Sequence, residues 1–354
     1  MTKSSLGSAI ENGKKSLAYR NYLKIRDRVL FMLEEGAGES GLPSDYWKEE
    51  LAGFNYMLDA SPLIIEKLRH HCYHLTGLRD YDYRGHHAHL QGAIEGKLRR
   101  LQALDRDNLL VPESLDLGGF GYRIGGALFN LDTLKFYESL IALNKLGLLA
   151  QLRSGPFERK VVMEIGAGWG GFAYQFKTLC PSVTYIIVDL PQTLLFSAVY
   201  LMTLFPSAST FIYGDQPEDG LYKTCQSYDF IFLPYYYVDR LHFSKLDLAM
   251  NMVSFQEMTT EQVRHYVRKA YELGCPIFYS LNRDRSPHNK QLTAVSSILS
   301  EYYRITPVEV LDVPYADLKK PSFRRVVKAF TRRLLRRSKL YSKREYRHLI
   351  GTRL

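Results

Sequence analysis

The sequence predicts an α/β domain built on a parallel sheet, preceded by a mainly helical N-terminal region. From residue 160 onward, short apolar runs alternate with segments of helical periodicity, which is the pattern of βαβ units whose strands are buried on both faces. Before residue 150, apolar residues recur at helical spacing and strand-like runs are rare. A glycine-rich loop directly follows the first apolar run, as in Rossmann-like folds with helices on both faces of the sheet.

The strands of this domain are expected at the short apolar runs, and its helices in the longer segments between them. The predicted strands cover residues 161–165, 185–188, 230–233, 246–250 and 276–280, and the predicted helices cover 170–179, 191–205 and 260–273. We therefore divide the chain into a helical region (1–150), a Rossmann-like domain (156–312) and a C-terminal tail (313–354).

Composition and the lack of targeting segments indicate a globular protein of the cytoplasm. Hydrophobic residues make up 46% of the 354 and charged residues 24%, which is too apolar for a disordered chain. The first fifteen residues lack the apolar core of a signal peptide, and no apolar run approaches the roughly 18–20 residues that cross a bilayer. Cys72, Cys180, Cys225 and Cys275 are widely spaced, which is typical of reduced cytosolic thiols.

The net charge of +10 belongs to the C-terminal tail. Residues 319–354 hold 14 basic residues and one acid, Glu345. Subtracting these from the 47 basic and 37 acidic residues of the chain leaves 33 and 36, so residues 1–318 carry a net charge of −3. Any electrostatic partner is therefore expected to bind the tail.

The tail has the pattern of a basic amphipathic helix. Its apolar residues follow i, i+3, i+4, i+7, i+11 spacing, and arginines and lysines surround them. The apolar stripe consists of Phe323, Val326, Val327, Phe330 and Leu334. Such a helix can lie in an anionic membrane interface, which would make the protein peripheral at the cytoplasmic membrane face. Nucleic acid is the less favoured partner, and a helix packed on the domain with solvated charges is the third interpretation.

A glycine loop marks the expected ligand site. Residues 164–171 read Glu-Ile-Gly-Ala-Gly-Trp-Gly-Gly and stand between the first predicted strand and a helix. Glycine lets the backbone turn sharply and approach a ligand closely. Asp189 ends the next strand, 23 residues after Gly166, where a carboxylate can accept hydrogen bonds from ribose hydroxyls.

The loop fits two nucleotide chemistries. Gly166, Gly168 and Gly171 satisfy the GxGxxG spacing of dinucleotide-binding folds, so a NAD-dependent oxidoreductase must be considered. The run ExGxGxG from Glu164 to Gly170 resembles motif I of class I S-adenosylmethionine-dependent methyltransferases. Glu164 favours the second chemistry, because an acid there would repel a pyrophosphate but suit the cationic amino and sulfonium groups of S-adenosylmethionine.

Further segments between residues 115 and 310 resemble the sugar O-methyltransferase family. They are Phe129-Asn-Leu-Asp-Thr133, Asp189-Leu-Pro191, Ser254-Phe-Gln-Glu-Met258 and Tyr279-Ser-Leu-Asn-Arg283, with residues 246–262 similar to the fourth strand of the methyltransferase fold and the helix after it. The resemblance implies methyl transfer from S-adenosylmethionine to a hydroxyl of a sugar or a nucleotide-linked sugar, with the N-terminal region covering the acceptor side. The cofactor contacts expected from the motifs and the strand assignment are Glu164, Gly166, Ala167, Gly168, Gly170, Asp189, Leu190 and Pro234.

The three main catalytic candidates lie near the fourth predicted strand: Glu257, Asn251 and His242. A sugar hydroxyl is a poor nucleophile, so a positioned base would help, and Glu257 is the first candidate. The alternative interpretation is that Glu257 faces solvent in the first turn of the following helix. Asn251 would orient the acceptor or satisfy a buried backbone group. His242 is a reserve base, together with Asp239.

Two assignments stay open at this point. Adenine contacts come from Asp215 if residues 210–213 form the third strand, or from Pro234 and Tyr235 if residues 230–233 do. We favour the second, because the strand that begins near Asp247 is then the fourth. A non-catalytic protein of this fold, bound to a membrane or RNA through its tail, is a further alternative to an enzyme.

No metal is expected, because the clustered histidines at 70–74 and 86–89 form no HExxH and the chain has no CxxC.

Overall fold

The computed structural model describes residues 3–37, 44–153, 159–215, 221–242, 245–284, 289, 291–292, 294–311 and 346–354. In this part of the chain the N-terminal region is helical. Its α-helices are α1 (Lys3–Lys14), α2 (Leu17–Gly36), α3 (Asp45–Phe54), α4 (Pro62–Ile65), α5 (Tyr73–Thr76), α6 (Gln91–Gln102), α7 (Leu131–Asn144) and α8 (Leu148–Arg153). Short 3-10 turns join several of them, among them η2 (Leu68–His71) and η4 (Gly85–Leu90).

One small hairpin interrupts this helical region. Strands β1 (Tyr122–Ile124) and β2 (Ala127–Phe129) pair antiparallel within the glycine-rich stretch before α7. Helix α7 then begins at Asn130, whose side chain accepts a hydrogen bond from the Thr133 N–H, as expected of an N-cap asparagine.

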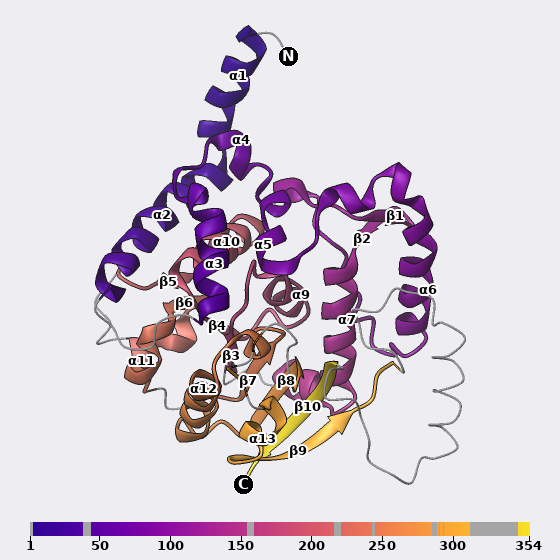
Figure 1. The fold of residues 1–354 in the computed structure, drawn as a ribbon, viewed down its shortest axis with the longest axis vertical. Coiled ribbons are helices and arrows are strands. Elements are labelled where there is room, and N and C mark those ends of the chain that lie inside the picture. The colour runs from indigo at the N-terminus through magenta and orange to yellow at the C-terminus, as the bar shows by residue number, and fades with distance from the viewer. Residues whose placement is uncertain are drawn as a thin grey trace.

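In the described residues of the second part of the chain, eight strands form one sheet. Its strands are β3 (Val161–Ile165), β4 (Thr184–Asp189), β5 (Thr210–Ile212), β6 (Phe230–Pro234), β7 (Leu248–Met252), β8 (Ile277–Arg283), β9 (Tyr303–Val308) and β10 (Tyr346–Arg353), in the order β5-β6-β4-β3-β7-β8-β10-β9. The strands from β5 to β8 in this order are parallel, whereas β10 pairs antiparallel with both β8 and β9. The expected α/β architecture, with a mostly parallel sheet behind a helical region, is confirmed (Figure 1).

The connections place helices on both faces of the sheet. Helix α9 (Gly171–Leu179) links β3 to β4, whereas α12 (Thr260–Glu272) links β7 to β8 in the opposite direction along the sheet. Right-handed crossovers that run in opposite directions lie on opposite faces. The order therefore reverses between β3 and β7, and the crevice at the carboxyl ends of these strands is where doubly wound sheets bind ligands.

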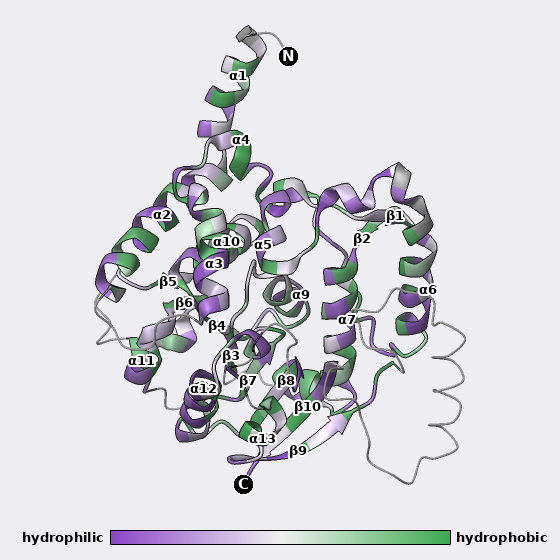
Figure 2. Ribbon diagram, in the orientation of Figure 1, coloured by the Kyte–Doolittle hydropathy of each residue, from purple (hydrophilic) through white to green (hydrophobic). Residues whose placement is uncertain are grey.

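Helix α10 (Pro191–Leu204) is covered on both sides. Its residues are buried almost all round, because it lies between the sheet and α2 of the N-terminal region. Helix α2 accordingly alternates apolar and polar residues along its length (Figure 2), with Tyr22, Ile25, Val29 and Met32 facing inward. Helix α1 extends away from this packed body (Figure 1). Within the described residues, no helix combines the length and the apolarity that crossing a membrane would require.

The strand assignments near the site can now be compared with expectation. Strand β6 lies beside β4, with Pro234 opposite Asp189, so residues 230–233 occupy the favoured third position. Thr210–Ile212 adds a further strand at the edge of the sheet beyond β6. Strand β7 begins at Leu248, two residues later than predicted. Asp247 lies just before the strand, where its carboxylate accepts a hydrogen bond of 2.9 Å from the Val161 N–H.

The predicted boundary of the tail needs a correction. Its last residues form β10, an interior strand between β8 and β9 that pairs Leu349 with Ser280 and with Pro307. The end of the chain is therefore part of the Rossmann-like domain. The amphipathic helix predicted around residues 323–334 lies outside the described residues.

Candidate active site

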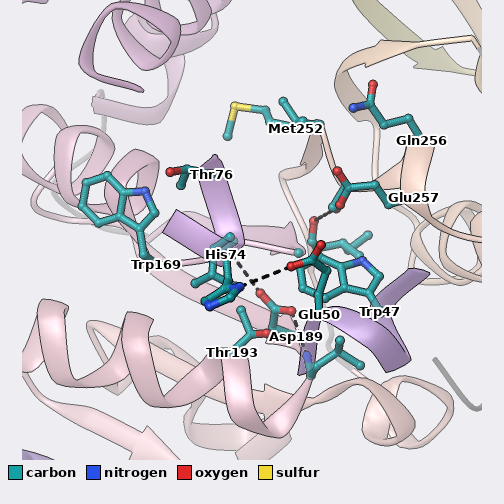
Figure 3. Close-up of a pocket in the computed structure, with 18 of the residues that line it drawn as sticks. Trp47, Glu50, His74, Thr76, Trp169, Asp189, Thr193, Met252, Gln256 and Glu257 are labelled. Atoms are coloured by element: carbon teal, nitrogen blue, oxygen red, sulfur yellow. Dashed lines mark hydrogen bonds and ion pairs between the residues drawn. The ribbon is translucent and has the colours of Figure 1, made fainter. Parts of the chain in front are cut away.

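A cavity of about 600 Å³ opens at the carboxyl ends of β3, β4 and β7, at the point where the strand order reverses. The glycine loop and the residues after β4 and β7 line it from the sheet side. The N-terminal region closes it with side chains from α3, α5 and α7. Figure 3 shows those of α3 and α5 facing the cavity, among them Trp47, Glu50 and His74. Sequence positions more than a hundred residues apart therefore share one site.

The glycine loop has the backbone that only glycine adopts readily. Gly166 and Gly168 have φ of +72° and +59°. A side chain at Gly166 would collide with Ser254 Oγ, whereas the space next to Gly168 is open for at least 4 Å. The loop therefore presents a bare backbone to the cavity at Gly168.

Asp189 links the loop to the neighbouring strand. Its carboxylate accepts hydrogen bonds from the Gly168 N–H (2.9 Å) and the Leu190 N–H (2.8 Å). Burial raises the pKa of this carboxyl to about 7, although the two N–H groups oppose the shift. A hydrogen-bond donor or a cation beside Asp189 would therefore stabilise the charged form of its carboxyl group.

Glu164 lies at the base of the cavity and is 2% exposed. The Tyr185 hydroxyl donates to its carboxylate at 2.7 Å. Burial nevertheless raises the pKa of Glu164 to about 8, and the Asp189 carboxylate adds to the shift, while the Tyr185 hydroxyl and the Lys135 ammonium only partly oppose it. A buried acid of this kind is suited to a cationic ligand group.

The remaining cofactor candidates divide into two groups. Ala167 and Leu190 line the cavity beside the residues already described. Gly170 and Pro234 do not line it: Gly170 is the N-cap of α9 with φ +84°, and Pro234 ends β6 beside Asp189. Tyr235, the residue after Pro234, provides the cavity wall at that position.

Glu257 faces the cavity from the turn that follows β7. The turn is the 3-10 helix η9 (Phe255–Glu257), and α12 begins only at Thr260, so Glu257 is not a residue of the helix's first turn. Burial raises the pKa of its carboxyl to about 8, while the nearby Lys135 ammonium opposes this and Glu50 adds to it. Such a carboxyl holds its proton at neutral pH, and once deprotonated it is a stronger base than an ordinary carboxylate.

The other two catalytic candidates lie elsewhere. Asn251 is fully buried behind the cavity wall: its amide donates to the Ile165 carbonyl at 2.7 Å and accepts from the Phe255 N–H at 3.1 Å. It thus satisfies backbone groups and holds the exit of β7 against β3. His242 is exposed and does not line the cavity, so its position does not support a role as base.

Sequence reasoning missed the cavity residues of the N-terminal region. Tyr46, Trp47 and Glu50 enter from α3, and Lys135 enters from α7. The α3 residues belong to no motif, and their helical spacing indicates only that one face of α3 is covered. Their place opposite the glycine loop is set by tertiary packing.

A buried ionic network fixes α7 and the glycine loop relative to each other. Arg69 in η2 is fully buried and donates to Glu113 (2.7 Å) and to Asp132 (3.0 Å). Its guanidinium also lies 3.7 Å from the ring centroid of Trp169, whose indole N–H donates to Asp132 at 3.2 Å. Asp132 in turn accepts from Lys135 at 3.0 Å. The network connects the N-terminal region directly to the glycine loop.

No group of three or more histidine, cysteine or carboxylate residues suited to a metal ion occurs among the residues described. Two histidines of the first cluster have other contacts. His71 Nδ1 lies 2.7 Å from the Tyr56 hydroxyl, and His70 Nδ1 lies 3.8 Å from the Asp80 carboxylate.

No protein-family model and no curated protein matches this chain. Among solved structures, magnesium protoporphyrin IX methyltransferase from Synechocystis PCC 6803 with bound SAH is 11% identical, over 74% of this chain and 95% of that one, with a TM-score of 0.34. An O-methyltransferase family protein from Burkholderia thailandensis is 10% identical, over 63% and 59% of the two chains, with a TM-score of 0.32. WbdD is 12% identical, and 71% of this chain matches 46% of WbdD with a TM-score of 0.36. Because these sequence identities and TM-scores are low, the fold assignment rests on the strand order and pairing of this chain itself.

Proposed function

We propose that this protein is an S-adenosylmethionine-dependent methyltransferase that acts on a sugar hydroxyl. The observation that carries the proposal is the meeting of Glu164, the bare loop at Gly168 and Asp189 in one cavity at the reversal of the strand order. These three features match the three parts of the cofactor: a cationic amino-acid end, a middle that needs close backbone approach, and a ribose. The fold likeness to solved methyltransferases is too distant to add to this.

The cavity residues fit the cofactor on their own chemistry. Glu164 is a buried acid with a raised pKa, and a neighbouring ammonium or sulfonium would compensate for its burial. Asp189 is placed to accept from ribose hydroxyls while its other contacts hold the loop. A pyrophosphate would meet the Glu164 carboxylate at the base of the same loop, which disfavours the NAD-dependent alternative.

The chemistry requires an acceptor oxygen held in line with the methyl group. The bound cofactor would supply an activated methyl on a sulfonium, and the electron pair of the broken C–S bond stays on sulfur. The protein's part is to position the acceptor hydroxyl and take its proton. Glu257 is the base in this proposal, since its carboxyl faces the cavity and a raised pKa of about 8 makes its carboxylate a strong proton acceptor. It would act in its deprotonated form, which a neighbouring sulfonium would favour. Asn251 keeps the Glu257 turn in place from behind.

The far wall of the cavity suits a sugar. Tyr46 and Trp47 provide aromatic surface, and Gln256, Gln262 and Tyr346 provide amide and hydroxyl groups. Flat aromatic faces and hydrogen-bonding side chains are what a ring with several hydroxyls needs for tight packing and orientation. A nucleotide-linked sugar would place its phosphates toward the exposed Arg79 at the edge of the cavity.

Calorimetric titration with S-adenosylhomocysteine tests the proposal. The wild type is expected to bind in the micromolar range, Asp189→Ala and Glu164→Ala to bind at least tenfold more weakly, and NADH to give no heat (each tenfold is about 1.4 kcal/mol). Binding of NADH without binding of S-adenosylhomocysteine would overturn the assignment in favour of an oxidoreductase. Binding of neither would favour a non-catalytic protein.

A further inference from the structure

Two polar atoms in the cavity wall are buried without a hydrogen-bond partner among the residues that the structure describes: His74 Nε2 and Thr193 Oγ1. Thr193 is 1% exposed and stands in the first turn of α10, just after Asp189. His74 belongs to α5 of the N-terminal region. Buried polar atoms in native proteins almost always have partners, so two orphans in one cavity indicate a ligand that satisfies them.

A chain of ring contacts links His74 to the helix that carries Thr193. The His74 ring is 5.8 Å from the ring of Phe54, which is 5.5 Å from the ring of Phe196. Phe196 lies one helical turn after Thr193 on α10, and residues three apart share a helix face. Figure 3 shows His74 and Thr193 in the same part of the view as Asp189. The N-terminal region therefore packs against α10 one turn after Thr193, and Thr193 follows Asp189 by four residues.

The contacts of His74 determine what its free nitrogen can do. The Glu50 carboxylate lies 3.5 Å from His74 Nδ1, and a carboxylate favours a proton on the nitrogen that faces it. In that tautomer, Nε2 carries the lone pair and accepts a hydrogen bond. Asp189 also accepts, whereas the Thr193 hydroxyl can both donate and accept. The matching ligand group brings several hydroxyl donors close together.

We propose that His74 and Thr193 hold the ribosyl hydroxyls of the cofactor's adenosyl group, beside Asp189. The inference rests on the proposed function, because it takes S-adenosylmethionine as the ligand. It gives the N-terminal region a role in cofactor binding itself, in addition to covering the acceptor. Neither residue belongs to the glycine loop or to the strand ends from which the cofactor contacts were expected.

Thr193→Val tests the inference most directly, because it keeps the shape and removes only the hydroxyl. Since Thr193 Oγ1 has no hydrogen-bond partner among the residues that the structure describes, the variant is expected to melt at the same or a higher temperature than the wild type. It is nevertheless expected to bind S-adenosylhomocysteine about two- to tenfold more weakly, which is the loss of one hydrogen bond. Thr193→Ser restores the hydroxyl and should restore affinity. Thr178→Val, at an exposed site on α9, is the matched control.

His74→Phe tests the second contact, and a ligand fragment tests the location of both. Calorimetry with 5′-methylthioadenosine, which keeps the ribose but lacks the amino-acid end, should show the same fold-loss for Thr193→Val and His74→Phe as S-adenosylhomocysteine does. Wild-type affinity in both variants would overturn this inference and leave the proposed function standing. A loss for S-adenosylhomocysteine alone would also overturn it, because the contacts would then be to the amino-acid end. If the wild type binds neither compound, the proposed function fails with it.

Discussion

Three carboxyl groups that line the cavity have pKa values that are raised by burial. Glu164 and Glu257 have pKa values of about 8 and Asp189 of about 7, against ordinary values near 4. Each group would be charged at pH 7 if it were exposed. The ligand-free site therefore holds protons that a cationic ligand would displace, and its chemistry is set by burial more than by paired charges.

At the residue scale this predicts how stability depends on pH. Between about pH 5 and pH 8 the folded chain keeps protons that the unfolded chain has released, so the free energy of unfolding falls as pH rises. Each fully protonated group contributes a slope of about 1.4 kcal/mol per pH unit in this window. Denaturant titrations of the ligand-free protein at several pH values measure the slope.

Glu164→Gln is expected to remove one group's share of that slope and to be more stable than the wild type at pH 8. Glu261→Gln, at a side chain that is 82% exposed on α12, is the control and should leave the slope as it is. A wild-type stability that rises from pH 5 to pH 8 would contradict the prediction.

At the element scale, the Arg69 network joins pieces that the sheet does not hold. Helix α7, the turn η2 and the glycine loop meet through one guanidinium that is buried with two carboxylates. Removing one partner from such a group leaves the others charged and without compensation, which costs much more than the pair contributes to stability.

Arg69→Met is therefore expected to lower the free energy of unfolding by about 3–5 kcal/mol, measured by chemical denaturation. Arg264→Met offers a comparison, because Arg264 makes a bidentate pair with Glu301 on the exposed face of α12. That pair is solvated, so its loss should cost about 1 kcal/mol or less. Equal losses of unfolding free energy in the two variants would show that the buried network contributes no more to stability than an exposed ion pair.

The sequence predicted the strands with an apolar pattern better than the strands without one. Strands β3, β4 and β6 are short runs of mostly apolar residues, which is the pattern expected of strands buried on both faces. The β1–β2 hairpin was missed, because three-residue strands in a glycine-rich stretch carry no periodicity. Strand β10 was missed, because it follows a long basic run and only its partners β8 and β9 determine its pairing.

At the scale of the whole molecule, the site consists of one part that the sequence could predict and one part that it could not. The glycine loop, Asp189 and Glu257 follow strands whose order is a property of the fold, so their meeting could be expected from spacing. The wall that contains Trp47, His74 and Lys135 could not, because it depends on how a separate helical region packs across the sheet edge. Motifs identify the part of a site that binds a common cofactor, whereas the rest depends on tertiary packing.

The path of the chain predicts the outcome of two different deletions. Truncation after residue 312 removes β10, an interior strand whose loss would leave β8 and β9 with unpaired edges. We expect this truncated protein to be insoluble or unfolded, whatever the role of the basic segment.

Replacing residues 313–345 with a short glycine-serine linker is the informative deletion. The register pairs Val308 with His348 antiparallel, so the ends that the linker must join lie close together, as in a hairpin. This variant is expected to stay folded, with a circular dichroism spectrum that retains the strand signal and with S-adenosylhomocysteine affinity unchanged. The membrane proposal for the basic segment then becomes testable by itself: co-sedimentation with phosphatidylserine vesicles should fall in the linker variant at unchanged fold. Equal sedimentation of the two proteins would contradict membrane binding through this segment, and unfolding of the linker variant would show that residues 313–345 are needed to bring β10 into the sheet.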